Sequence, residues 1–154
     1  MNKKILILWV VLLTLLPAQT PYIPIERSGD EVIEPQGPGE INWTKQMIKA
    51  KGWGIIDTIH PKAQAKILAT TAAIAVAQRN LLEIVKGVRV VSEMKVQDMI
   101  SQSDYIYKRI EGVVKGAQMV GEPVEKEGVI EVELGPVPIF VEILNFAIVD
   151  IIII

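Results

Sequence analysis

Residues 61–87 read PKAQAKILATTAAIAVAQRNLLEIVKG, the longest stretch of the chain with a helical pattern. Proline is tolerated at the first position of a helix, because the N–H that it lacks would have no partner there. Glycine is common just past the last turn. We therefore predict a long alanine-rich helix over residues 61–86 that ends at Gly87.

The apolar positions of this helix predict a broad core face. Its small residues are interpreted as packing residues that let a sheet or a second helix approach closely. The predicted stripe consists of Leu68, Ala72, Ala75, Arg79, Leu82 and Val85, with Ile67, Ile74 and Leu81 beside it. The small residues are Ala69, Ala72, Ala73, Ala75 and Ala77, and the predicted solvent side carries Lys62, Lys66, Glu83 and Lys86.

Alternating apolar and polar residues on both sides of the helix indicate strands. We predict strands over residues 41–50, 88–96, 117–124 and 129–134, with residues 125–128 as a hairpin loop between the last two. Gly52-Trp53-Gly54 is expected to end or bend the first strand, by a bulge or a close backbone approach. Ser101 or Ser103 is expected to cap a shorter helix that ends at Gly116.

This order, β-α-β-α-β-β, predicts an α+β fold. We expect an antiparallel or mixed four-stranded sheet, with the long alanine-rich helix and the shorter helix packed on one face. A chain of 154 residues is long enough for one domain. The predicted organisation is a signal peptide (1–18), a proline-rich tether (19–40), an α/β domain (41–136) and an apolar tail of uncertain structure (137–154).

The N-terminus has the layout of a secretory signal peptide. Lys3 and Lys4 precede an apolar run over residues 5–16, and Pro17 then ends it. Such a run is too short to span a bilayer, which takes about 20 residues. We expect export to the periplasm or the outer membrane, with cleavage near Ala18–Gln19, which the intact mass of the exported protein would report. An uncleaved anchor and a buried apolar segment are the alternatives.

Two further segments flank the predicted domain. Residues 19–40 are rich in proline and glycine and are interpreted as an extended tether or as an N-terminal segment without a role. Residues 139–154 are apolar apart from Glu142, Asn145 and Asp150. We expect this tail to cover the sheet as an extra strand or helix, with a truncated reading frame and an interfacial tail as alternatives.

Composition excludes several kinds of site. The net charge of −2 disfavours a nucleic-acid partner. The absence of cysteine excludes disulfides, thiolate metal sites, a cysteine nucleophile and an N-terminal lipidated cysteine. His60 is the single histidine, so a zinc site would need carboxylates alone. Gly52-Trp53-Gly54 lacks the third glycine of a dinucleotide loop, and we expect no cofactor, no metal and no catalytic residue set.

The candidate contact residues lie near the end of the long helix and just after it. Arg79 is expected to pair with Glu83 or Asp98 and so to fix the helix on the sheet; a contact with a partner protein is the alternative. Asn80 is grouped with them as a structural or partner contact.

The segment over residues 77–98, AQRNLLEIVKGVRVVSEMKVQD, resembles the Lpp-twenty lipoprotein family, which includes flagellar protein P and is similar to the N-terminal domain of flagellar assembly protein T. Further matching stretches are INWT (41–44), GWG (52–54), SDYI (103–106), EGVVKGA (111–117) and GVIEVEL (128–134). The resemblance spans residues 41–134. It implies a non-enzymatic envelope protein, but the acylated cysteine of the lipoprotein members is missing, which leaves the mode of any membrane association open.

The leading hypothesis is therefore an exported, non-enzymatic structural or assembly module, similar to flagella-associated proteins. It would act by protein–protein contacts, either by self-association through sheet edges or the helix face, or with other envelope proteins. The second hypothesis is a periplasmic module that binds a small apolar ligand between helix and sheet.

Overall fold

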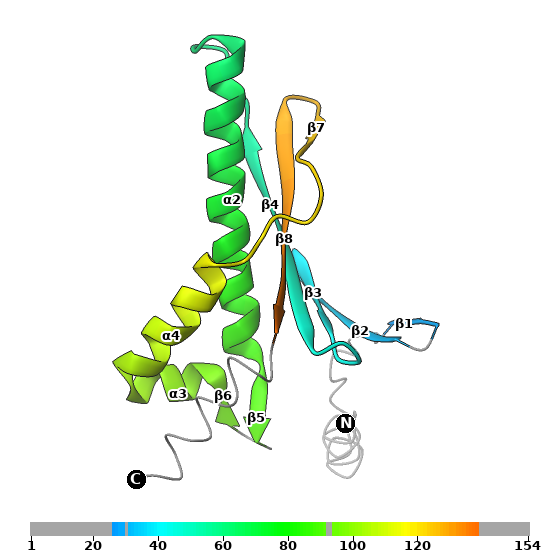
Figure 1. Ribbon diagram of the computed structural model, residues 1–154, viewed down its shortest axis with the longest axis vertical. Helices are drawn as coiled ribbons and strands as arrows, with labels where there is room; N and C mark the ends of the chain where they lie inside the picture. The colour runs from blue at the N-terminus through cyan, green and yellow to red at the C-terminus, as the bar shows by residue number, and fades with distance from the viewer. Residues whose placement is uncertain (1–25, 30, 92–93, 139–154) are drawn as a thin grey trace, which may run out of the picture.

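The computed structural model describes residues 26–29, 31–91 and 94–138, and these form an α+β fold (Figure 1). The expected signal peptide (1–18) and residues 139–154 of the tail lie outside the described residues. Within the described part, one antiparallel sheet has the strand order β1-β2-β3-β4-β8-β7, and β5 and β6 form a separate hairpin. The sheet strands are β1 (Glu26–Ser28), β2 (Glu31–Gln36), β3 (Gly39–Asn42), β4 (Met47–Ile55), β7 (Val124–Lys126) and β8 (Val129–Pro138).

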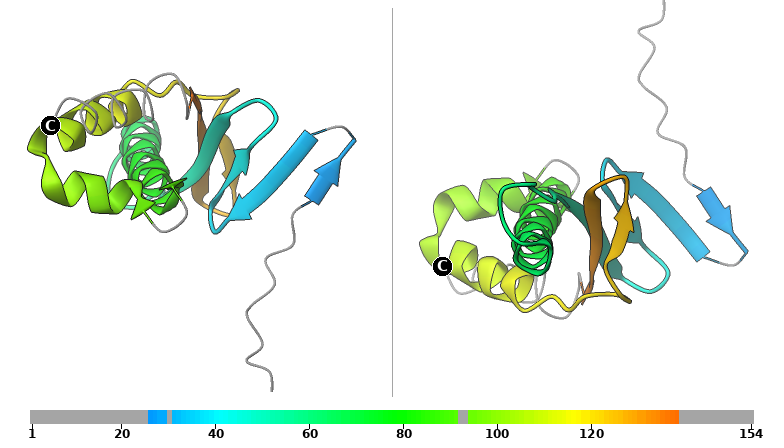
Figure 2. Two further views of the ribbon diagram at one scale, coloured as in Figure 1. Left: turned by 90° about the horizontal axis from the view of Figure 1, so that it is seen from below. Right: turned by 90° about the horizontal axis from the view of Figure 1, so that it is seen from above.

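All the described helices lie on one side of this sheet (Figure 2). Helix α2 (Lys62–Gly87) packs on β4 and β8, whereas α3 (Val96–Gln102) and α4 (Asp104–Lys115) lie against α2 rather than on the sheet. Figure 1 shows that α3 and α4 contact only the C-terminal half of α2, next to the hairpin of β5 (Arg89–Val91) and β6 (Met94–Lys95).

Several predicted elements are confirmed. Pro61 is the N-cap residue of α2, and Ser103 caps α4 by accepting a hydrogen bond from the Ile106 N–H. The last hairpin is present, and its loop is formed by Glu127 and Gly128, whose φ angles are 50° and 78°. Two successive positive φ angles suit a type I′ turn, which matches the twist of the flanking strands.

The predicted four-stranded order is wrong, because three segments fold differently. The run over residues 41–50 is a hairpin: Asn42 Oδ1 accepts the Lys45 N–H and Gln46 takes a φ of 56°, which turns β3 into β4. The run over 88–96 supplies β5 and β6 of the separate hairpin. Residues 117–124 carry one isolated bridge, Met119 to Leu134, before β7 begins at Val124.

The expected tether is also partly wrong, since β1, β2 and the start of β3 lie within residues 19–40. Proline had argued against a central strand, yet Pro35 stands opposite Glu40 in the ladder between β2 and β3. The Trp43 N–H bonds the Val32 carbonyl, so alternate pairs along the ladder are hydrogen-bonded and the Pro35 pair is not. The missing N–H of Pro35 therefore costs no bond to β3.

The buried face of α2 matches the predicted stripe only near its C-terminal end, where Val85 and the neighbouring Leu81 are fully buried. Ala65, Ala69, Ala73 and Ala77 face the sheet, whereas Leu68 is 46% exposed. Ala72, Ala75 and Arg79 are exposed as well. The reason lies under the helix: Gly52 and Gly54 of β4 bring its backbone against α2, so only the alanine face fits. The expected close approach at Gly52-Trp53-Gly54 is thus confirmed, and β4 continues through it.

The rest of the core follows the predicted pattern more closely. Ile130, Val132 and Leu134 of β8 are buried, with Glu131 and Glu133 on the other face. Strand β8 also continues past the predicted domain boundary at residue 136. It ends at Pro138.

Candidate interaction site

Asn80 is the one buried polar side chain among the described residues, with 9% of its surface exposed. Its Nδ2 donates a 2.8 Å hydrogen bond to the Lys51 carbonyl of β4. Pro38, the residue opposite Lys51, accepts the Lys51 N–H but has no N–H of its own to donate to the Lys51 carbonyl. Asn80 therefore fixes α2 on the sheet, a structural contact that sequence reasoning had assigned to Arg79.

The expected ion pair of Arg79 is wrong. Arg79 is exposed on α2. Glu83 pairs with Lys86 at 3.0 Å on the same helix. Asp98 accepts the Lys95 N–H at 2.8 Å and so caps the first turn of α3. Of the four candidate residues, Asn80 fixes α2 on the sheet and Asp98 caps α3. Arg79 and Glu83 lie on the surface.

We expect Asp98→Ala to lower the free energy of unfolding by about 1 kcal/mol, because an N-terminal cap of α3 is lost. Asp98→Asn keeps an oxygen that can accept the Lys95 N–H, so it should cost clearly less. Urea denaturation of both variants checks this. Equal losses in the two variants would contradict the capping role.

One part of β4 has an unpaired edge. The Ile56 N–H bonds the Gly128 carbonyl, so Gly54 and Gly52 are the residues of β4 whose backbone groups pair with β8. By the same alternation, the N–H and C=O groups of Trp53 and Ile55 point toward the β3 side. Strand β3 begins at Gly39, which stands opposite Ala50 of β4. The next backbone bond along this side of β4, from the Lys51 N–H to the Pro38 carbonyl, is the last one before Trp53. The described chain therefore leaves Trp53 and Ile55 as a free strand edge.

Apolar side chains gather around this free edge. Trp53 is 50% exposed and Ile55 76% exposed, on the face of the sheet away from the helices. On the other face, Ala69 of α2 stands over Gly54, and the neighbouring Leu68 is half exposed. We call Trp53 and Ile55 the β4-edge patch. A free edge bordered by apolar side chains is a known template for pairing with another strand.

Charged side chains follow the patch on the open face of the sheet. Lys51 Nζ lies 3.0 Å from Glu131 Oε1 across β4 and β8. Their hydrogen bond raises the pKa of Lys51 and lowers that of Glu131. A shallow groove of about 320 Å³ runs beside this pair, between Trp53 and the turn at Gly37. Both charges are solvated, so the pair contributes little to stability and mainly keeps this part of the face polar.

His60 takes part in a local turn. Its Nδ1 lies 3.1 Å from both carboxylate oxygens of Asp57, and Asp57 Oδ1 accepts the backbone N–H groups of Ile59 and His60. These bonds, with the backbone N–H of His60 first, lower the pKa of Asp57. The described residues contain no group of three metal-ligating side chains. The arrangement therefore orders the segment between β4 and α2.

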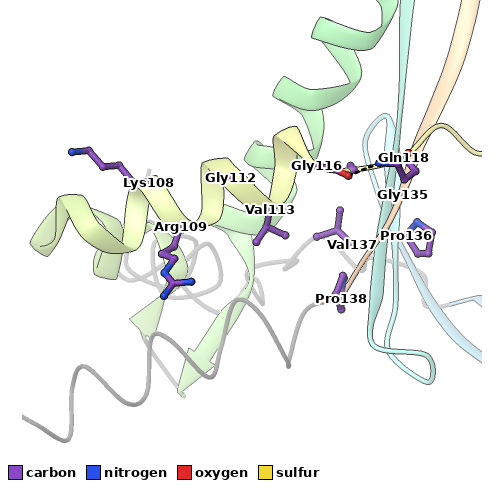
Figure 3. Close-up of a pocket in the computed structure, with 11 residues that line it drawn as sticks. Lys108, Arg109, Gly112, Val113, Gly116, Gln118, Gly135, Pro136, Val137 and Pro138 are labelled. Atoms are coloured by element: carbon purple, nitrogen blue, oxygen red, sulfur yellow. Dashed lines mark hydrogen bonds between the residues drawn. The ribbon is translucent and has the colours of Figure 1, made fainter.

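An open cleft of about 770 Å³ lies between α4 and the end of β8 (Figure 3). Figure 3 shows Val113 of α4 on one side and Val137 and Pro138 of β8 on the other. Arg109 leaves the same side of α4 as Val113, and its Nε donates a 2.9 Å hydrogen bond to the Tyr105 hydroxyl. Sequence reasoning missed this cleft, because only the fold brings α4 and the end of β8 together.

Helix α2 is long and apolar enough to cross a membrane by length and composition alone. Its alanine face packs on the sheet, so a core helix accounts equally well for this pattern. Comparison of the chain with protein-family models, with curated proteins and with solved structures finds no match.

Proposed function

We propose that this chain is an exported, non-enzymatic envelope module that acts through protein–protein contacts. The β4-edge patch is the observation that carries the proposal. The N–H and C=O groups of Trp53 and Ile55 on the β3 side pair with no strand among the described residues. The two side chains add exposed apolar surface next to these groups. An extended strand of another chain can pair with such an edge through its backbone and cover the apolar side chains.

The source of that strand is either a second copy of this chain or another envelope protein. The ordered motifs over residues 41–134 that resemble the Lpp-twenty family support a role in the envelope. The signal-like N-terminus supports export, and flagellar association remains part of the proposal on the strength of the resemblance alone.

The second hypothesis, a small apolar ligand between helix and sheet, gains no specific support from the described residues. At Gly52 the backbone of α2 is so close that an added Cβ would lie 2.8 Å from the Ala77 Cβ and still closer to backbone atoms. The same holds at Gly54 against Ala69. The centre of the helix–sheet interface is therefore closed.

We expect Trp53→Lys combined with Ile55→Lys to weaken association at least tenfold, because two charges on a strand edge oppose pairing with another strand. The self-association arm is measured by sedimentation equilibrium of the exported protein over a range of concentrations. The partner arm uses the tagged protein to capture and identify proteins from its own envelope fraction.

Tyr105→Lys is the matched control, because Tyr105 is an aromatic residue of similar exposure, 52%, on α4 rather than on β4. It should leave both arms unchanged. A protein that stays monomeric at all concentrations and captures no envelope protein would refute the proposal, as would equal effects of the β4 variant and the control.

A further inference from the structure

We propose that residues 139–154 of the same chain dock into the cleft between α4 and β8. This inference goes beyond the proposed function and does not depend on it. The cleft is lined by Val113 and Ala117 on the α4 side and by Val137 and Pro138 at the end of β8. The described chain thus stops at a residue that itself lines the cleft.

The position of Pro138 brings the next residues to the cleft without any linker. Each extended residue advances a chain by about 3.3 Å, so the distance from Pro138 into the cleft is short compared with the length of the segment that follows. A tethered segment of this kind has a high effective concentration at the adjacent site. A separate molecule would have to compete with that local concentration.

The chemistry of residues 139–154 matches the cleft. Apart from Glu142, Asn145 and Asp150, every residue in this segment is hydrophobic. Burial of such side chains in an apolar cleft is favourable because it removes apolar surface from water. The cleft volume of about 770 Å³ lies within the range of roughly 300–1,000 Å³ that pockets for small ligands cover. It therefore has room for several apolar side chains.

The charges are complementary as well. Glu142 and Asp150 are the only charged residues of the segment, and both are acidic. Among the described residues that line the cleft, Lys108 and Arg109 are the charged ones, and both are basic. The Tyr105 hydroxyl accepts the Arg109 Nε–H, which holds this side chain beside α4. An apolar segment with acidic residues thus fits an apolar cleft with a basic rim.

The absence of cysteine makes a direct test possible, since two introduced thiols are the only ones present. Val113→Cys combined with Phe146→Cys places one thiol in the cleft wall and one in the segment. A short bis-maleimide should link them within one chain, at monomer mass. The control pairs Phe146→Cys with Ile59→Cys, an 89% exposed residue before α2. We expect the cleft pair to link at least tenfold faster than the control pair.

Ala117→Cys is the alternative wall position if Val113→Cys lowers the yield of folded protein. Equal linking rates for the cleft pair and the control pair, or links only at dimer mass, would overturn docking within the chain. A second measurement tests the charges. Glu142→Lys with Asp150→Lys should slow linking several-fold, and Lys108→Glu with Arg109→Glu on the same protein should restore it. A linking rate unchanged by the first reversal would overturn the assignment of the basic rim.

Discussion

Replacement of Gly54 by alanine is expected to lower the free energy of unfolding by about 3 kcal/mol. An added Cβ would overlap the Ala69 carbonyl group of α2 and would lie 3.1 Å from the Ala73 backbone nitrogen. Both neighbours are helix backbone, so no side-chain rotation relieves the contact. Either α2 moves away from β4, which opens the alanine interface, or the strand bends. Urea or thermal denaturation followed by circular dichroism measures the loss.

Gly87→Ala is the control for this prediction. Gly87 is the last residue of α2, its φ is not in the left-handed region, and an added Cβ would meet no atom within 4 Å. Alanine there should leave stability unchanged or raise it by less than about 1 kcal/mol. A Gly54→Ala protein as stable as the control variant would show that α2 does not pack on β4 as described.

Asn80→Leu is expected to cost about 1–3 kcal/mol, the penalty for a buried acceptor left without a donor. Leucine is close to asparagine in size, but it cannot donate to the Lys51 carbonyl. The measurement is again the free energy of unfolding. Arg79→Leu, one position earlier on the exposed side of α2, is the matched control and should change stability by less than about 0.5 kcal/mol.

Asn80→Asp gives the same contact a pH dependence. Burial and the facing carbonyl oxygen both disfavour the charged form of the introduced carboxyl, so its pKa is raised in the folded state. The unfolded chain loses its proton near pH 4, so the stability of the variant falls relative to the natural protein as pH rises above that value. We therefore expect the penalty to be larger at pH 7 than at pH 4, where the protonated acid can donate to Lys51. A pH-independent penalty would contradict the contact.

Both predictions concern one feature, the fit of α2 to β4. Gly54 sets how close the helix lies, and Asn80 donates to the Lys51 carbonyl, which the opposite Pro38 cannot satisfy. Further along β4, at Trp53 and Ile55, the backbone groups on the β3 side have no partner among the described strands. This free edge is the proposed contact surface. The β4 residues that contact α2, Lys51 and Gly54, are therefore neighbours of the β4 residues proposed to bind partners.

The sequence by itself determined the elements whose signals are local. The start of α2 just after Pro61, the cap of α4 at Ser103, which was one of two predicted serines, and the turn at Gly128 depend mainly on neighbouring residues. The alternation of Ile130, Val132 and Leu134 likewise assigned their face of β8. A general role for alanines in close packing could also be predicted from their size.

Only the tertiary structure decided which face of α2 is buried, and which strands pair. Hydrophobicity favours Ile67 and Leu68 as core residues, but the glycines of β4 admit only Ala69, Ala73 and Ala77. The alternation of apolar and polar residues over 41–50 and 88–96 does not show where the chain reverses direction, because the residues before and after each turn follow the same alternating pattern. The bond from Asn80 to Lys51 and the free edge at Trp53 depend on where β3 begins beside β4. The α4–β8 cleft forms where segments distant in the sequence meet. No local pattern could therefore indicate these features.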